Sequence, residues 1–242
     1  MAALKGKIAI VTGASGGIGR AIAERLAADG AGVVVHYNRR GERAEEVVAA
    51  IRSNGGPALA LQADMGRVAD ARVVTETVAR YGRLDILVNN AGKFAPKPFL
   101  DTTEADFDAV IGLHAKGPYF AMQEAARVLA ENGRIVNIST AGTQLNFHEA
   151  SAYLASKRAL EQMTKGIAQE LAPRGITVNA VAPGITDTGV LTETYRELGI
   201  RRSPMQRVGH PAEIADVVGF LVSEEARWVT GQTIQVGGGI VM

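Results

Sequence analysis

Short apolar runs alternate with longer amphipathic stretches from one end of the chain to the other. Most of the short runs are continuously apolar, which is typical of strands that are buried on both faces of a parallel sheet. The runs that predict strands are Ile8–Val11, Val33–His36, Leu59–Gln62, Ile86–Val88, Ile135–Ile138, Thr177–Val181 and Thr233–Val236.

The stretches between these runs carry apolar residues at the spacing of one helix face. A strand followed by a helix, repeated along the chain, indicates right-handed crossovers and an α/β fold with a doubly wound sheet. The stripes that predict helices are Ile18, Ile22 and Leu26; Val47, Val48 and Ile51; and, after Pro211, Ile214, Val217, Val218 and Leu221.

A chain of 242 residues fits one α/β domain or two small ones, and no shift in composition marks a linker. Lys and Arg number 26 against 25 Asp and Glu, and no basic block appears, so we expect neither nucleic acid nor a membrane as partner. The absence of cysteine excludes disulfides and thiolate ligands, and we predict no metal site. No signal peptide or membrane span is visible, which favours a cytoplasmic protein.

A glycine-rich turn, Thr12–Gly19, follows the first predicted strand and opens the first predicted helix. Gly13 allows a tight turn, Gly16 or Gly17 lets the backbone approach a pyrophosphate, and Gly19 lets the helix pack closely on the strand. The free N–H groups of the helix N-terminus favour phosphate. The alternative is a turn with a purely structural role.

The end of the second predicted strand indicates the type of dinucleotide. A carboxylate there usually binds the ribose of NAD, whereas cations and neutral donors suit the 2′-phosphate of NADP. The chain has Asn38, Arg39 and Arg40 at this place and no acid before Glu42, which favours NADP(H). A solvated basic turn without a ligand is the alternative.

Tyr153 and Lys157 lie four residues apart in a helical pattern that runs from Ser151 to about Leu171, so they share one helix face. A phenol with a pKa of ~10 is a poor base at neutral pH. A neighbouring ammonium stabilises the phenolate and is expected to lower its pKa toward the working pH, as general acid–base catalysis requires. Taken alone, such a pair is more often structural.

Taken together, these motifs resemble those of the short-chain dehydrogenases/reductases along essentially the whole chain. The resemblance implies one Rossmann-like domain over residues 1–242, with a seven-stranded parallel sheet of order 3-2-1-4-5-6-7, assembled into a homotetramer or dimer. The features that carry it are Thr12–Gly19, Asp64, Asn89-Asn90-Ala91-Gly92, Asn137-Ile138-Ser139, Tyr153-x-x-x-Lys157, Pro183-Gly184, Gly231-Gln232 and Gly237-Gly238.

By resemblance, Tyr153 is the acid/base, and Lys157 lowers its pKa while it binds the nicotinamide ribose. Asp64 and Met65 would face the adenine, and Pro183–Thr186 would hold the carboxamide end. The residues expected to bind the cofactor are Gly13, Ser15, Gly17, Ile18, Gly19, Asn38, Arg39, Arg40, Asp64, Met65, Asn90, Ala91, Gly92, Tyr153, Lys157, Pro183, Gly184, Ile185 and Thr186.

Two places depart from the family pattern. The serine that polarises the substrate lies 13 or 14 residues before the tyrosine, where this chain has Thr140 and Ser139. The sequence around these residues resembles that of naphthol reductases and of 3-oxoacyl-carrier-protein-reductase-like enzymes. Naphthol reductases have the 14-residue spacing, which favours Ser139. His114 replaces an asparagine that anchors a proton-relay water. If the imidazole participates, it should add an inflection between roughly pH 6 and 7.5 to the pH–rate profile; the alternative is that His114 only packs between helices.

The function predicted from the sequence is therefore an NADPH-dependent carbonyl reductase that interconverts a ketone and a secondary alcohol of a small-molecule substrate. One alternative is a 3-oxoacyl-[acyl-carrier-protein] reductase with Arg127, Arg158 and Arg174 as candidate docking residues, and another is a non-catalytic NADP(H)-binding regulator. The least regular stretch, 187–210, is expected to form a lid over the substrate.

Overall fold

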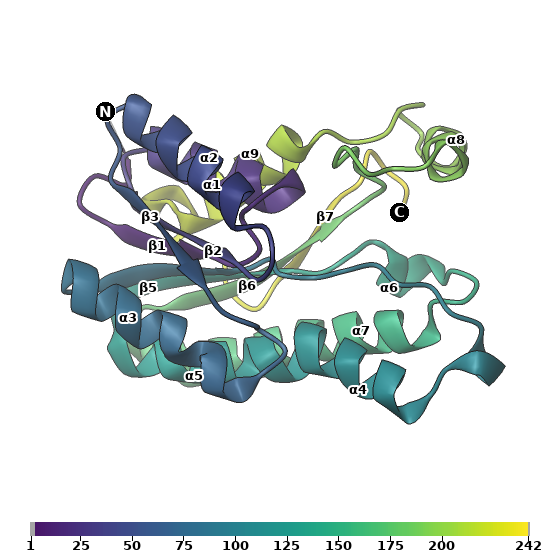
Figure 1. The fold of residues 1–242 in the computed structure, drawn as a ribbon, viewed down its shortest axis with the longest axis horizontal. Coiled ribbons are helices and arrows are strands. Elements are labelled where there is room, and N and C mark those ends of the chain that lie inside the picture. The colour runs from purple at the N-terminus through teal and green to yellow at the C-terminus, as the bar shows by residue number, and fades with distance from the viewer. Residues whose placement is uncertain (1–2, 242) are drawn as a thin grey trace.

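A computed structural model describes residues 3–241, and its centre is a parallel sheet of order β3-β2-β1-β4-β5-β6-β7 (Figure 1). Each strand is hydrogen-bonded in parallel to its neighbours, which confirms the predicted fold class and strand order. The strands are β1 (Ile8–Val11), β2 (Gly32–Tyr37), β3 (Ala58–Gln62), β4 (Leu84–Asn89), β5 (Leu129–Ile138), β6 (Thr177–Pro183) and β7 (Thr233–Val236).

The predicted strands all exist, and β5 differs most from its prediction, because it begins at Leu129 rather than Ile135. Leu129 pairs with Leu84, after which the register between β4 and β5 shifts. The added part of β5 contains the exposed residues Glu131 and Asn132, so no apolar run could indicate it.

Helices cover both faces of the sheet (Figure 1): α1, α2 and α9 lie on one face, and α3, α4, α5 and α7 on the other. The α-helices are α1 (Gly17–Ala28), α2 (Gly41–Ser53), α3 (Val73–Tyr81), α4 (Glu104–Ile111), α5 (Gly117–Val128), α6 (Gly142–Leu145), α7 (Ser151–Leu171), α8 (Glu193–Arg202) and α9 (Pro211–Val222). A π-helical turn, η3 (Gly112–Lys116), joins α4 to α5. Short 3₁₀ turns are η1 (Val68–Arg72), η2 (Phe99–Asp101), η4 (Ala172–Arg174) and η5 (Glu224–Ala226).

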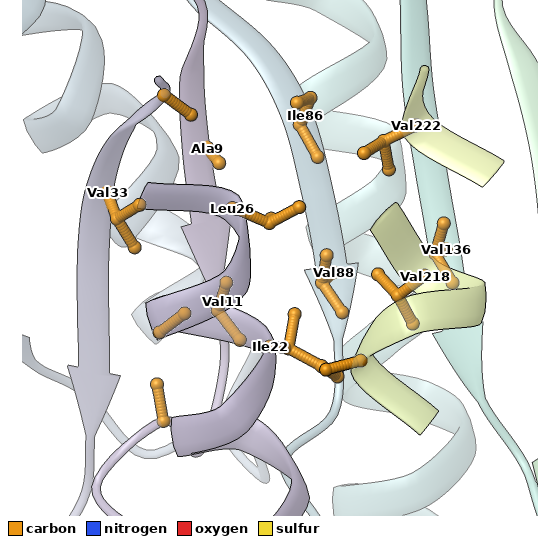
Figure 2. Packing of buried hydrophobic residues seen from close by; sticks show 14 of the residues in the cluster. Ala9, Val11, Ile22, Leu26, Val33, Ile86, Val88, Val136, Val218 and Val222 are labelled. Carbon is orange, nitrogen blue, oxygen red and sulfur yellow. The ribbon is translucent and has the colours of Figure 1, made fainter. Parts of the chain in front are cut away.

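The core consists of two apolar clusters, one on each face of the sheet. On one face, Ile22 and Leu26 of α1 and Val218 of α9 pack over Val11 and Val88 (Figure 2). The alternate strand residues belong to the second cluster, whose members include Ile10, Val34, Leu87 and Met122. Because successive strand residues point to opposite faces and both faces are covered, the strands are apolar throughout.

The expected lid is more regular than its sequence indicated, because α8 occupies its middle. Most residues of α8 are polar and few are buried, so no apolar stripe revealed it. Glu193 in its first turn and Arg201 and Arg202 in its last turn complement the helix dipole. The expectation of an irregular segment over the whole of 187–210 was therefore wrong, whereas its role as a lid stays a prediction.

Between residues 3 and 241, no helix combines the length and the apolar character that crossing a bilayer requires. Within the same range, no three or more His, Asp or Glu side chains gather closely enough to hold a metal ion.

Candidate active site

The predicted site residues gather where the carboxyl ends of β1, β4, β5 and β6 meet. The strand order reverses between β1 and β4, and open α/β sheets bind ligands in the crevice at such a switch point. The glycine-rich turn follows β1, Asn90 follows β4, Thr140 follows β5, and Gly184 follows β6. The topology therefore brings residues from distant parts of the sequence to one edge of the sheet.

The glycine-rich turn needs its glycines for two physical reasons. Gly13 and Gly17 have φ values of +66° and +54°, in the left-handed region that side chains disfavour. A Cβ on Gly13 would lie 2.9 Å from the Cα of Ala91, and one on Gly19 would lie 2.4 Å from the Gly13 carbonyl oxygen. Gly16, in contrast, borders open space.

The N-terminus of α1 fits a phosphate group. No side chain caps the first turn of α1, which begins at Gly17, so its N–H groups point toward the open space beside Gly16. Ser15 is half-buried in the turn, and Ile18 packs partly against the core. This arrangement matches the diphosphate site expected from the sequence.

Thr12 ties the glycine-rich turn to the segment after β4. Its hydroxyl accepts the N–H groups of Asn90 and Ala91, each at 2.9 Å, and donates to the Val88 carbonyl at 3.2 Å. The Asn90 amide donates to the Thr12 carbonyl at 2.9 Å and to that of Gly13 at 3.3 Å. Asn90 therefore fixes the wall of the crevice through its side chain.

His36, a buried residue of β2 that the sequence analysis did not single out as a site residue, supports the same glycine-rich turn. The Gly13 N–H donates to Nδ1 of His36 at 3.0 Å, and Nε2 of His36 lies 3.0 Å from the Ala63 carbonyl. Nδ1 must keep its lone pair to accept, so Nε2 carries the proton. Burial lowers the pKa of His36 and keeps the imidazole neutral.

The loop after β2 leaves Asn38, Arg39 and Arg40 exposed beside the crevice. Within residues 3–241, the ion pairs of the structure involve neither Arg39 nor Arg40, so both guanidinium groups can receive an anion. Asp64 is half-buried after β3 and accepts the Gly66 N–H at 3.0 Å. The Met65 side chain is packed in the core, so an adenine at this place would contact the main chain of Met65 rather than its side chain.

The phenol of Tyr153 lies between two other rings. Its ring centroid is 5.3 Å from that of His114 and 5.2 Å from that of Phe94, both edge-to-face. Burial raises the pKa of Tyr153 to about 12, and a side-chain hydrogen bond with Thr140 opposes the shift. Desolvation of the phenolate dominates, so the shift is opposite to the one expected from Lys157, whose effect on the phenol stays a prediction.

The two candidates for the polarising hydroxyl point in different directions. The Thr140 side chain is close enough to the Tyr153 hydroxyl to lower its pKa, whereas the Ser139 hydroxyl donates to the Glu161 carboxylate at 2.6 Å and is buried. Successive side chains at a strand end face opposite sides, so only one of the two can reach the phenol. This geometry contradicts the preference for Ser139 and favours Thr140.

Lys157 is buried one helix turn beyond Tyr153, as the spacing predicted. Its Nζ donates to the main-chain carbonyl of Ile138 at 2.7 Å, which ties α7 to the end of β5. Burial lowers the pKa of Lys157 to about 8, and the charge of Glu161 opposes this shift. The negative charge of Glu161 therefore helps the Lys157 ammonium to remain charged near neutral pH.

His114 lies in the π-helical turn η3 and is almost completely buried. Its Nε2 accepts the Lys93 N–H at 3.0 Å, which requires a neutral ring. Burial and the Lys157 charge lower the pKa of His114 to about 3, and the Val110 carbonyl opposes them. A pKa of about 3 contradicts the inflection expected from a participating imidazole and favours the alternative, in which His114 packs between helices.

The segment after β6 covers the crevice from its other side. Pro183 is buried, and a Cβ on Gly184 would lie 2.7 Å from the Cα of Gly237, so this strand end has no room for a larger residue. The N–H of Gly209 donates to the Ile185 carbonyl at 2.8 Å, and Thr186 pairs with Gly209 in an isolated bridge.

Two contacts connect the expected lid to the site. A Cβ on Gly17 would lie 3.2 Å from Cβ of Thr188, so the start of the lid lies against the glycine-rich turn. Tyr195 of α8 packs edge-to-face on Phe94 at 5.7 Å, and Phe94 in turn contacts the Tyr153 ring. These aromatic residues extend the candidate site toward the lid.

Sequence reasoning missed Glu161, His36, Phe94 and Tyr195. Glu161 has a signal that could have found it, because it follows Lys157 by four residues and so shares the helix face of the catalytic pair. His36 lies near the end of β2, and only its contacts in the folded chain show that it supports the glycine-rich turn. Phe94 is brought to the site by the loop after β4 and Tyr195 by α8, whose paths no local spacing reveals.

Comparisons with known proteins agree with this architecture. Residues 13–241 match the family model described as Enoyl-(Acyl carrier protein) reductase. The chain is 39% identical over 242 residues to the 3-oxoacyl-[acyl-carrier-protein] reductase FabG of Staphylococcus aureus, with 98% of each protein covered. It is 38% identical over 260 residues to a probable tetrahydroxynaphthalene reductase of Zymoseptoria tritici, with 99% of this chain and 96% of that protein covered.

Among solved structures, the angucycline C-6 ketoreductase LanV with bound NADP is 43% identical and superposes with a TM-score of 0.94, covering 98% of this chain and 96% of LanV. LanV has also been solved with NADP and rabelomycin, with a TM-score of 0.91 to this chain. The chain belongs to the short-chain dehydrogenase/reductase family of oxidoreductases, which confirms the resemblance drawn from its motifs.

The lowered pKa of His114 predicts a pH-dependent stability. The unfolded imidazole has a pKa of ~6.5 and the folded one about 3, so only the unfolded state binds this proton as the pH falls between these values. Acidification therefore removes stability below pH ~6.5. We expect the Tm of His114→Asn to fall less between pH 7 and pH 5 than that of the parent protein, as measured by calorimetry.

The matched control is His148→Asn, because the side chain of His148 is 95% exposed. This variant should keep the pH dependence of the parent. An equal loss of Tm in His114→Asn and the parent would contradict a buried neutral imidazole at position 114.

Proposed function

We propose that this chain is an NADP(H)-dependent ketoreductase that interconverts a ketone and a secondary alcohol of a small-molecule substrate. The observation that carries the proposal is a protonated phenol, Tyr153, whose pKa the neighbouring Thr140 side chain lowers and which lies one helix turn from Lys157. This group stands at the edge of a crevice whose opposite side is a glycine-rich phosphate site.

The described residues fit a dinucleotide. Gly13, Gly17 and the N-terminus of α1 would hold its diphosphate, and Arg39 and Arg40 would bind a 2′-phosphate. Two further segments, Asn90–Gly92 and Pro183–Thr186, would line its nicotinamide half. When bound, the nicotinamide supplies the hydride, while the protein contributes position and control of the proton. LanV, at 43% identity, was crystallised with NADP, which supports this choice.

The side chains around Tyr153 suit proton donation to a carbonyl oxygen. With a pKa of about 12 the phenol is protonated at neutral pH, so in the reductive direction it can give its proton to the developing alkoxide. The Thr140 hydroxyl would donate a second hydrogen bond to the same oxygen. Charged Lys157 would stabilise the phenolate that remains after transfer.

An aromatic or fused-ring ketone is the substrate class we favour. Phe94 is 40% exposed and lies between Tyr153 and Tyr195, so its ring borders the place where the carbonyl must lie. Flat rings pack well against such aromatic edges. The structure of LanV with rabelomycin supports this choice by analogy.

A 3-oxoacyl-[acyl-carrier-protein] reductase is the second candidate, favoured by 39% identity to FabG. Its acidic partner would need a free basic surface. Arg127 is paired with Glu124 at 3.4 Å, Arg158 with Glu161 at 2.8 Å, and Arg174 with Glu131 at 2.9 Å, so all three candidate docking residues are already engaged. The non-catalytic regulator is disfavoured by the Thr140–Tyr153 pair, which cofactor binding alone does not require.

We also propose that the chain assembles into a homotetramer or a dimer. Large apolar side chains are exposed on two separate parts of the surface, Phe107 and Tyr119 on α4 and α5, and Phe220 and Trp228 near α9. Trp228 is 96% exposed, and grouped exposed apolar residues commonly mark contacts between subunits.

The proposed reaction is tested by NADPH oxidation with a panel of fused-ring ketones, simple ketones and 3-oxoacyl thioesters. We expect fused-ring ketones to have the highest kcat/KM. Tyr153→Phe keeps the ring and removes the proton donor, so it should bind NADPH normally and lose about 10²–10⁴-fold in kcat. A preference for thioesters would favour the second candidate, and NADPH binding without turnover of any carbonyl would favour the regulator.

Cofactor preference should depend on the loop after β2. Replacing Arg39 and Arg40 together with glutamine removes both candidate phosphate ligands, each of which contributes roughly 1.5–3 kcal/mol if it makes a charge-assisted hydrogen bond. We expect Kd for NADPH to rise about 100-fold or more if both contacts are made, while that for NADH changes little. Arg80→Gln, an exposed change on α3, is the control. Equal kcat/KM for the two cofactors in the parent enzyme would overturn the choice of NADPH.

The hydroxyl that polarises the substrate should be that of Thr140. Thr140→Val keeps the side-chain shape and removes the donor, and the loss of one such donor costs about 10²–10³-fold in kcat. Ser139→Ala should cost only several-fold, because its hydroxyl faces Glu161 rather than the phenol. Steady-state kinetics of the two variants with one ketone decide the matter, and the reverse ranking would return the role to Ser139.

A further inference from the structure

Glu161 is a buried carboxylate for which the proposed reaction has no direct use. It is 3% exposed and lies on α7 one turn beyond Lys157 and two turns beyond Tyr153. Ionised side chains are rarely buried unless they are paired and hydrogen-bonded, because desolvation of an unpaired charge is costly. The contacts of Glu161 therefore indicate what it does.

Both carboxylate oxygens of Glu161 are engaged. Oε1 accepts the hydroxyl of Ser139 at 2.6 Å and that of Thr143 at 2.8 Å. Oε2 accepts from the guanidinium of Arg158 at 2.8 Å, and Arg158 is largely exposed. Oε1 thus faces the interior of the site, whereas Oε2 is turned toward the surface.

The two residues that donate to Oε1 bracket Thr140. Ser139 precedes it, and Thr143 lies in the first turn of α6, where its hydroxyl is also 3.0 Å from the Thr140 carbonyl. The Gly142 N–H donates to the Thr140 hydroxyl oxygen at 3.2 Å. Thr140 therefore lies in a short segment that Glu161 holds from both sides.

The same helix holds this segment at a third point, through the Lys157 bond to the Ile138 carbonyl. Since Tyr153 is on α7 as well, these contacts fix the position of Thr140 relative to the phenol. A hydroxyl that must reach the same oxygen atom as the phenol needs this accuracy, because a misplacement of ~1 Å can cost about 100-fold in rate.

Glu161 also provides the negative charge nearest to Lys157 that opposes the effect of burial. The titratable groups that face the ammonium within the described residues are Glu161 and Tyr153 on α7 and His114 on η3. Tyr153 and His114 are neutral at pH 7, so Glu161 is the group among them that favours a charged lysine.

We propose that Glu161 is a positioning residue that aligns Thr140 with Tyr153 through Ser139 and Thr143, and that keeps Lys157 in its charged form. The proposal rests on the ketoreductase function proposed above, because it assigns Glu161 a role in positioning or charging Thr140, Tyr153 and Lys157. It predicts separable geometric and electrostatic contributions.

Glu161→Gln separates the two contributions. The amide oxygen can still accept from Ser139 and Thr143, but the charge is lost. We expect kcat at the pH optimum to stay within about threefold of the parent enzyme, because the alignment of Thr140 with Tyr153 contributes more to the rate than the charge of Glu161 does. The alkaline limb of kcat/KM should move to lower pH, because Lys157 loses its proton more readily.

Glu161→Leu removes both contributions and should lower kcat about 100-fold with little change in KM. If this variant does not fold, Ser139→Ala combined with Thr143→Val tests the alignment instead, and should lower kcat far more than Ser139→Ala alone. Arg158→Gln is the matched control, since it removes the surface contact to Oε2 and should leave both kcat and the alkaline limb unchanged.

A measurement without turnover keeps this proposal distinct from the proposed function. In protein labelled with ¹³C at the lysine Cε, the NMR resonance of Lys157 is assigned by its loss in Lys157→Arg, and its pKa is read by titration. We expect a value of about 8 in the parent protein and a lower one in Glu161→Gln. An unchanged Lys157 titration in Glu161→Gln, or parent kcat in a folded Glu161→Leu or in the double variant, would overturn the proposal. Inactivity of the parent enzyme toward every ketone would instead count against the reaction.

Discussion

The parallel arrangement of seven buried strands is the constraint on which the rest of this structure depends. All strands point the same way, so every carboxyl end lies at one edge of the sheet, and helices on both faces leave that edge as the place for polar chemistry. The glycine-rich turn, Asn90, Thr140 and Gly184 meet there for this reason. The packing of Ile10 and Val11 on opposite faces thus serves the site indirectly, by holding the strands in register.

The sequence predicted those features that local spacing determines. Strands with continuous apolar runs and the bounds of α7 could be predicted, because helix periodicity places Tyr153 and Lys157 on one face whatever surrounds them. The choice between Ser139 and Thr140 could not be, because it depends on how the chain turns after β5. The spacing to Tyr153 gives only the number of residues between the two. The contact of Ser139 with Glu161 shows that the Ser139 hydroxyl points away from the phenol.

Other features escaped because their cause is burial rather than pattern. The polar sequence of α8 gives no apolar stripe. The low pKa of His114 and the high pKa of Tyr153 both follow from desolvation, which only the folded surroundings determine. From sequence alone, only the ordinary pKa of a histidine or tyrosine can be assumed. The burial that lowers the pKa of His114 and raises that of Tyr153 could not be predicted from it.

Burial has different consequences for Tyr153, His114 and Lys157, and the difference is consistent with the proposed ketoreductase reaction. Desolvation keeps Tyr153 protonated and His114 neutral, so neither competes as a base near neutral pH. Desolvation also lowers the pKa of Lys157, the group that would stabilise a developing phenolate in the proposed reaction. Glu161 offsets that loss from one helix turn away, at a distance from the reacting atoms. A buried pair of opposite charges therefore accompanies two neutral rings, and a proton can leave the phenol without leaving an isolated charge behind.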